Sequence, residues 1–296
     1  MKEHKKVISR IDSAQIQMIT AMGIFGTVGI FVKKIPLSSG EIALFRAIIA
    51  ILAIVGFQMI RKKKLCYKLI KKDLPILMFS GVAMAFNWIL LFQAYKYTSI
   101  SIATLSYYFA PVIVMLLSSV IFDEKISRKQ LICFGFATIG LVLVMNINHS
   151  DGNRNHMIGI LFGLGAAFLY ALVILLNKKI KHITGIDRTI CQFTAAILVL
   201  LPYVIATSGI RIASVGSKGL MYLMILGLLH TGFTYVLYFS SVKNLPGQKV
   251  AILSYIDPLI AVIVSVVVLA ESISVQQVIG GFMILIFTLL DECVFS

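Results

Sequence analysis

The sequence has little charge for its length: of 296 residues, 13% are charged and only 12 are acidic. Soluble domains carry about a quarter charged residues, so this composition excludes an ordinary soluble enzyme. The composition also excludes a disordered chain, because disordered chains are poor in large apolar residues and 59% of the residues here are hydrophobic. The apolar residues form stretches of roughly 18 to 22, each long enough to cross a hydrocarbon core about 30 Å thick. The composition therefore predicts a polytopic membrane protein.

Catalytic and metal-binding motifs are scarce as well. The sequence holds no Walker loop, no H-E-x-x-H and no G-x-S-x-G. The four cysteines lie far apart with no C-x-x-C pair, which predicts neither a disulfide framework nor a zinc site; they are Cys66, Cys133, Cys191 and Cys293. We therefore expect neither an ATP-driven pump nor an enzyme, and no catalytic residue, metal or cofactor.

The apolar stretches predict ten transmembrane helices and hence an all-α membrane protein. We place these helices at 16–33, 40–60, 74–94, 99–121, 129–147, 157–177, 188–208, 219–240, 247–269 and 274–291. Pro75 suits the first turn of its helix, where a missing N–H costs nothing. The predicted organisation is an N-terminal tail (1–15), a first five-helix repeat (16–147), an external linker (148–156) and a second five-helix repeat (157–291).

The basic residues predict the orientation of these helices. With the N-terminus inside, the inner segments carry 20 Lys and Arg and the outer loops carry 6. Cytoplasmic loops are enriched in Lys and Arg, so both termini are predicted to face the cytoplasm of the cell membrane. The net charge of +15 is explained by such loops, above all by the one at 61–72, and no nucleic-acid partner is expected.

An internal repeat relates the two halves of the chain. A shift of 147 residues pairs 88–130 with 235–277, and twelve of those 43 positions match; among them are Lys96/Lys243, Tyr108/Tyr255, Pro111/Pro258, Glu124/Glu271, Ser127/Ser274 and Gln130/Gln277. Unrelated apolar helices would not share Lys, Pro, Glu and Gln in register. Five helices in each half would insert the second copy upside down, and inverted repeats are typical of secondary transporters.

These motifs resemble the EamA-type transporters of the drug/metabolite transporter superfamily. The resemblance rests on Ala43-Leu-Phe-Arg46, on Ala103-x4-Tyr108-x2-Pro111 with Glu124-x-Ile-Ser127-x2-Gln130, and on Tyr255-Ile-Asp257-Pro258 with Glu271-Ser-Ile-Ser274-x2-Gln277. It covers nearly the whole chain. It implies two five-helix EamA domains, export of a metabolite, and a central site lined by helices 16–33, 74–94, 99–121, 157–177, 219–240 and 247–269.

Asp257 is the first candidate for the site. It lies about ten residues into its helix, where a carboxylate costs about 2.5–3.5 kcal/mol on insertion scales. The repeat places Ala110 at the equivalent position, so the fold does not require an acid there. Asp257 is either a site for a substrate cation or a coupling proton, or a carboxyl kept neutral inside the bundle. Ser254 lies three residues earlier on the same face.

Other polar and aromatic residues at mid-depth are candidate wall residues. Tyr108 and Tyr255 each precede a mid-helix proline that frees a backbone carbonyl for a cavity or for packing. Further wall candidates on neighbouring helices are Asn87, Trp88, Tyr107 and Tyr170.

One helix carries a polar stripe at four-residue spacing, formed by His230, Thr234 and Tyr238, which should face protein or water rather than lipid. His230 is either a proton relay, because histidine titrates near physiological pH, or a residue bonded to a neighbouring helix.

Three further features receive structural interpretations. Arg46 is expected to reach back to the outer interface or to pair with a helix end. Glu124 and Glu271 are expected to bond the start of the next helix, where carboxylates complement the helix dipole. Glycines in two helices should permit close packing; they are Gly23, Gly26, Gly29, Gly159 and Gly163.

Together these observations predict a secondary transporter that works by alternating access. Aromatic walls and one acid suit a small amphipathic solute with an ammonium group, an amino acid or an amine, with protons as a coupling partner through Asp257 and His230. The alternatives are a sugar derivative, a nucleotide precursor or a lipophilic drug as solute, or a membrane sensor or scaffold without transport. A monomer and a homodimer both remain open.

Overall fold

The computed structural model describes residues 2–60, 67–121, 126–145, 154–180, 182–183, 185–242, 244–245 and 247–290. Within these ranges the chain is helical and contains no strand, which confirms the predicted all-α class. The first half holds α1 (Lys2–Gly26), α2 (Val28–Lys34), α3 (Ser39–Ile60), α4 (Tyr67–Tyr97), α5 (Ile100–Tyr107), α6 (Ala110–Ile121) and α7 (Arg128–Met145). The second half holds α8 (Arg154–Lys179), α9 (Gly185–Thr207), η1 (Ile212–Ser214), α10 (Gly216–Gly227), η2 (Leu228–Phe233), α11 (Thr234–Val242), α12 (Gly247–Ser254), α13 (Ile256–Leu269) and α14 (Val275–Leu290).

Seven helical segments of the described chain are long and apolar enough to cross a membrane. They are Ser13–Lys34, Ser39–Ile60, Ile70–Tyr97, Ile100–Ile121, Asn155–Lys179, Gly185–Thr207 and Gly216–Val242. Two shorter apolar helices, Ile256–Leu269 and Val275–Leu290, follow them. The protein is therefore a multi-pass membrane protein.

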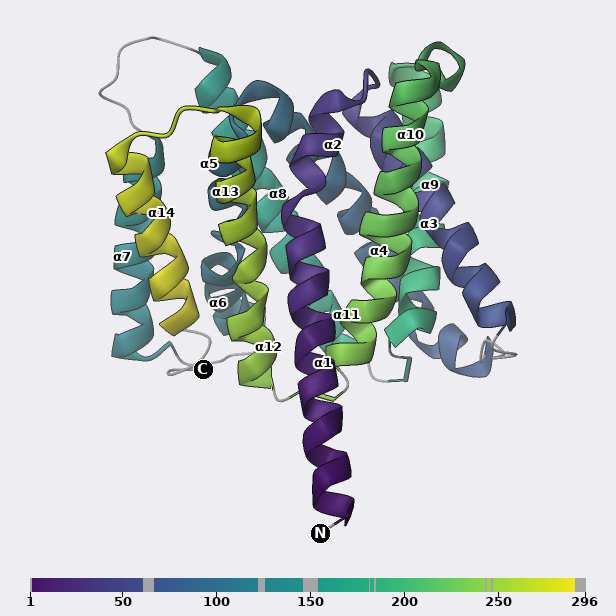
Figure 1. Ribbon diagram of the computed structural model, residues 1–296, viewed down its shortest axis with the longest axis horizontal. Helices are drawn as coiled ribbons and strands as arrows, with labels where there is room; N and C mark the ends of the chain where they lie inside the picture. Colours follow the sequence, from purple (N-terminus) through teal and green to yellow (C-terminus); the bar gives the residue numbers. More distant parts are fainter. Residues whose placement is uncertain are drawn as a thin grey trace.

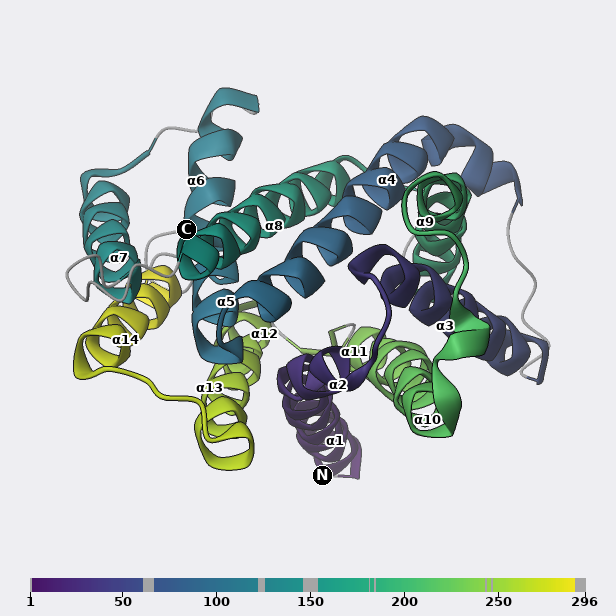
Figure 2. The same cartoon turned by 90° about the horizontal axis from the view of Figure 1, so that it is seen from above.

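The halves interlock, because each sends its first helix onto the other half. The second half's α8 packs against α4 and α5, and the first half's α1 packs against α11 and α13. Figure 1 shows that α1 and α8 start at opposite ends of the bundle. Seen from above in Figure 2, α7 and α14 form one end of the molecule and α3, α9 and α10 the other.

A pair of small residues sets the crossing of α7 and α14. A Cβ added at Gly140 would lie 2.6 Å from the carbonyl oxygen of Gly280, and a Cβ at Gly280 would meet the carbonyl of Gly140 in return. Only glycine permits this separation of two helix backbones. The contact joins equivalent helices of the two halves.

The repeated serine and glutamine begin these two helices as capping boxes. In α7 the Ser127 N–H donates to Gln130 Oε1 (2.9 Å) and the Gln130 N–H donates to Ser127 Oγ (3.2 Å). The start of α14 repeats both bonds at the same distances with Ser274 and Gln277. Each box satisfies backbone donors that a helix start leaves open, which explains why serine and glutamine recur in register.

Each half also contains a broken helix at its repeated proline. The α5 helix ends at Tyr107 and α12 ends at Ser254, which are the residues four before Pro111 and Pro258. A proline ring clashes with the carbonyl at that position and cannot donate to it, which weakens the helix at the two places where these breaks occur. The predicted helices 99–121 and 247–269 are therefore each two pieces.

Other predicted boundaries are corrected by the structure. Pro75 lies inside α4, which begins at Tyr67, so its prediction as a first-turn residue is wrong. The helix predicted at 16–33 extends back to Lys2 and breaks at Thr27. The Thr27 hydroxyl bonds the carbonyl of Ile24 at 2.8 Å, and such local bonds compete with helix continuation.

A central cavity as the candidate substrate site

A cavity of about 910 Å³ lies between the two halves. Its lining comes from α1, α2, α3, α4, α7, α8 and α11 and from both broken helices, α5–α6 and α12–α13. The lining reaches Gln130, Lys178 and Val250, which lie near the helix ends on the side where α1 begins. This volume suits a small solute, since ligand pockets usually measure about 300–1,000 Å³.

At the opposite side of the bundle Glu271 ties three segments together. It pairs with Lys33 of α2, accepts the Ser265 hydroxyl of α13, and accepts the Ile100 N–H of α5 at 2.8 Å. None of these four residues lines the cavity. The prediction that Glu271 bonds the start of the next helix is wrong, because its helix-start partner is α5 rather than α14. Glu124 lies outside the described residues.

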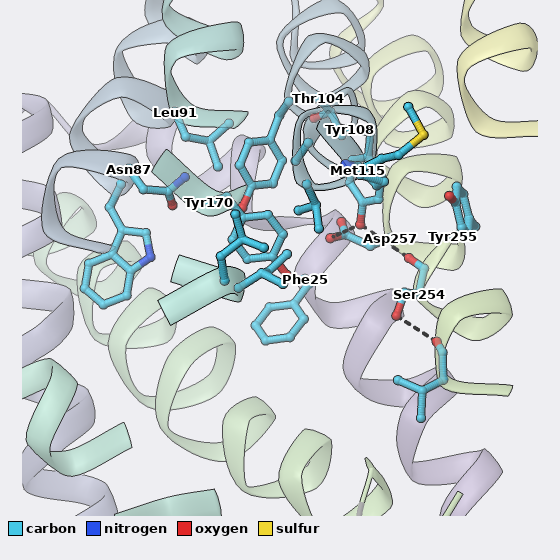
Figure 3. A pocket seen from close by; sticks show the side chains of 18 of the residues that line it. Phe25, Asn87, Leu91, Thr104, Tyr108, Met115, Tyr170, Ser254, Tyr255 and Asp257 are labelled. Atoms are coloured by element: carbon cyan, nitrogen blue, oxygen red, sulfur yellow. Dashed lines mark hydrogen bonds between the residues drawn. The ribbon is translucent and has the colours of Figure 1, made fainter. Parts of the chain in front are cut away.

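Asp257 and Tyr108 meet across the interface of the halves. The Tyr108 hydroxyl donates to Asp257 Oδ2 at 2.8 Å, and the two side chains point toward one another in Figure 3. The same hydroxyl lies 3.3 Å from the carbonyl oxygen of Ser254, the carbonyl that Pro258 leaves without a helical donor. Asp257, Tyr108 and Ser254 were all predicted as site residues, and all three line the cavity.

Tyr255, the repeat partner of Tyr108, makes a different bond. Its hydroxyl donates to Thr288 Oγ1 of α14 at 2.7 Å, and its ring turns away from Asp257 in Figure 3. Tyr255 still contributes to the cavity lining.

The remaining aromatic candidates pack against other aromatic rings at the cavity. Tyr107 and Tyr170 lie ring against ring with centroids 5.3 Å apart, and Trp88 packs edge-on against Phe193 at 5.2 Å. Asn87 donates from Nδ2 to the carbonyl of Ala166 at 2.6 Å, which holds α4 against α8. Tyr107, Tyr170, Trp88 and Asn87 all line the cavity.

The polar stripe of the second half lies beside the cavity and is absent from its lining. His230 Nε2 lies 2.8 Å from Thr27 Oγ1, and Thr234 donates to the carbonyl of Leu229 at 2.7 Å. Tyr238 packs against Phe25 with centroids 6.5 Å apart. The stripe thus faces α1, and its transport role stays a prediction.

The structure contradicts the prediction that Arg46 reaches the outer interface or pairs with a helix end. Its side chain does not reach back to the interface: the residue is 4% exposed and lines the cavity. Its Nε donates to Thr231 Oγ1 at 2.8 Å, and its guanidinium carbon lies 4.7 Å from the centroid of the Trp88 ring. The sequence contains a signal for this role, since a charged residue inside a membrane helix marks a functional site by default. The expectation that Arg46 reaches the outer interface is wrong because Arg46 lies deeper in the bundle than its position in the helix suggests.

The cavity contains other residues that the sequence did not single out. They share no motif and come from α1, α4, α5 and α11; they are Phe25, Tyr95, Thr104 and Tyr235. Cys133 and Cys191 are not joined by a disulfide within the described residues, whereas Cys66 and Cys293 lie outside them.

Comparisons with known proteins agree with this architecture. The model of the EamA-like transporter family matches residues 12–146 and again 157–290. The uncharacterized transporter YxxF of Bacillus subtilis is 29% identical over 96% of this chain and 91% of its own length. A probable amino-acid metabolite efflux pump of Salmonella typhimurium is 25% identical over 73% of this chain and 75% of its own length. A crystal structure with 15% sequence identity shares the fold, with a TM-score of 0.64 over 94% of this chain and 95% of that one.

Proposed function

The chain belongs to the EamA-like transporter family and is a membrane transporter, and we propose that it exports a small amphipathic solute, an amino acid or an amine. The observation that carries this proposal is the cavity, where the Asp257 carboxyl lies among aromatic residues. Aromatic faces attract cations by about 0.5–2 kcal/mol, and a desolvated carboxylate adds to this attraction. The Salmonella relative, named as an amino-acid metabolite efflux pump, supports export and this solute class.

We propose that α7, α12–α13 and α14 also cross the bilayer, which makes ten crossings in two inverted five-helix repeats. The pairs α4–α8 and α1–α11 are then equivalent contacts. Exchange of conformations between such halves alternately exposes a central site to each side. The cavity lining reaches the side where α1 begins, and the Glu271 cluster joins helices at the other side, as alternating access requires.

The Lys and Arg bias supports placing the α1 side in the cytoplasm of the cell membrane. The arrangement is then the inward-facing state of an exporter, ready to take solute from the cell. Protons are proposed as the coupling partner, with Asp257 as the group that binds cation and proton in turn.

Counterflow in proteoliposomes tests this function. The liposomes hold unlabelled amino acids or amines, and uptake of the labelled pool is followed with and without a pH gradient. We expect liposomes with the native protein to accumulate labelled solute. Uptake should be about 10-fold or more lower with Asp257→Asn, because the substrate cation loses its charged partner. Asp187→Asn is the matched control, since Asp187 is absent from the cavity lining and bonds Gln58 at 2.7 Å.

If folded protein showed no counterflow with the amino-acid pool and none with the amine pool, the proposed solute class would be contradicted. Flux that is equal in the native protein and Asp257→Asn would remove Asp257 from the site. Flux that is the same with and without the pH gradient would contradict the proposed coupling to protons.

A further inference from the structure

Arg46 is a buried cation with no charged partner in the part of the chain that the structure describes. It is 4% exposed, and no carboxylate of the described residues lies within salt-bridge distance of it. Burial of an unpaired charge is costly even after the structure relaxes. Contact with the Trp88 and Phe92 rings, whose centroids lie 4.7 and 5.3 Å from the guanidinium carbon, offsets part of that cost. The site is therefore electrostatically incomplete.

The donors of Arg46 show where its partner would bind. Nε donates to Thr231, and the terminal nitrogens have no hydrogen-bond partner among the described residues. Buried side-chain atoms without a partner in the described chain are Ser101 Oγ, Ser106 Oγ and Arg188 Nε, and the terminal nitrogens of Arg46 are not among them. They are therefore open to the cavity that Arg46 lines.

The neighbouring helix holds the guanidinium in place. The Thr231 hydroxyl accepts from Arg46 and donates to the carbonyl of Leu226 at 2.8 Å, so its orientation is fixed. Thr231 lies in the π-helical segment η2, and such segments occur frequently at functional sites. A fixed guanidinium presents its terminal N–H groups in a fork that matches a carboxylate.

The cavity lining therefore holds Asp257 and Arg46, which carry opposite charges and are not joined by an ion pair, whereas its third charged residue, Lys178, lies near the helix ends on the side where α1 begins. We propose that Arg46 binds the carboxylate of the transported solute while Asp257 binds its ammonium, so that the substrate is an amino acid rather than an amine. This inference rests on the proposed function and narrows its solute class.

Competition in the counterflow assay tests this assignment. Native protein exchanges a labelled amino-acid pool against unlabelled pairs that differ in the carboxylate alone: L-phenylalanine and phenethylamine, L-leucine and isoamylamine, L-lysine and cadaverine. For the carried members, we expect the amino acid to compete about 10-fold or more better than its amine. This arm needs no variant, so a folding defect cannot obscure it.

Variants then assign the preference to Arg46. Arg46→Gln should abolish the preference for the amino acid over the amine, and Arg46→Lys should keep part of it, because the charge stays and the fork is lost. Thr231→Val, which removes the acceptor of the Arg46 Nε bond together with the bond that Thr231 donates to Leu226, should weaken the preference without abolishing it. Thermal unfolding of each variant in detergent shows whether it is folded.

The outcomes separate this inference from the function on which it rests. Amines that compete as well as amino acids in the native protein would overturn the carboxylate site while leaving a carrier of ammonium solutes. A preference that survives in folded Arg46→Gln would also overturn it. Absence of exchange with both pools would instead remove the proposed solute class itself.

Discussion

The two broken helices, α5–α6 and α12–α13, share the position of their backbone break but differ in the side chains beside it. Both α5 and α12 end four residues before a proline, and the equivalent tyrosines Tyr108 and Tyr255 stand at the two breaks. Tyr108 reaches across to Asp257 in the other half, whereas Tyr255 bonds Thr288 within its own half. At the position equivalent to Asp257, the first half has Ala110. The repeated prolines break the helix in both halves, whereas a difference at one position places a carboxyl in the second half only.

This difference shows how a nearly symmetric scaffold can bind an asymmetric solute. Residues that start helices or break them are shared by both halves, because each half needs the same bends. The tyrosines that line the cavity are also shared, but Asp257 has Ala110 as its counterpart, because a solute with one ammonium group needs one carboxylate. Arg46 adds a second asymmetry on the wall formed with Trp88.

The largest effect that separates the two broken helices is expected from their tyrosines. Tyr108→Phe removes the hydrogen bond that positions the Asp257 carboxyl, a bond to a charged group worth about 1.5–3 kcal/mol. Tyr255→Phe removes a bond to the neutral Thr288 hydroxyl, worth about 1 kcal/mol. We expect the half-saturating solute concentration in counterflow to rise about 10-fold or more in Tyr108→Phe and to change little in Tyr255→Phe. Equal effects of the two variants would contradict the asymmetry.

A smaller effect is expected where α1 approaches the break beside Asp257. A Cβ at Gly26 would lie 2.6 Å from the carbonyl oxygen of Asp257 and 2.7 Å from the Ile260 Cβ, so Gly26→Ala must displace α1 or α13. Such overpacking costs about 1–3 kcal/mol, and unfolding in detergent should measure it together with a slower flux. Gly23→Ala on the same helix is the control, because a Cβ there meets nothing within 4 Å. A Gly26→Ala variant as stable and active as Gly23→Ala would contradict the close contact.

The smallest effect should fall equally on both halves. Ser127→Ala and Ser274→Ala each remove the hydroxyl that accepts the glutamine N–H, which is one of the two bonds of the capping box, at a cost of about 0.5–2 kcal/mol. We expect the two variants to lose similar unfolding free energy and to keep the solute preference of the native protein. A large difference between them would mean that the helix starts, like the breaks, have diverged.

Much of the fold follows from local features of the chain. Membrane crossing follows from apolar length, and the equivalence of the halves follows from shared Lys, Pro, Glu, Ser and Gln residues. The repeated prolines also predict where a carbonyl is freed, since the clash of a proline ring acts only four residues back along the same helix. Most of the cavity candidates could be predicted for the same reason, because polar and aromatic residues inside an apolar helix must face protein or solute.

The partners of these residues could not be predicted, because they come from distant parts of the chain. Tyr108 and Asp257 are separated by 149 residues, and Arg46 and Thr231 by 185. The sequence by itself determined a membrane-embedded helical protein with two related halves, through the length, composition and spacing of its apolar segments. Only the tertiary structure decided that Arg46 faces the cavity and that Glu271 joins α2, α5 and α13, because the packing of helices from both halves sets the partner of each buried polar group.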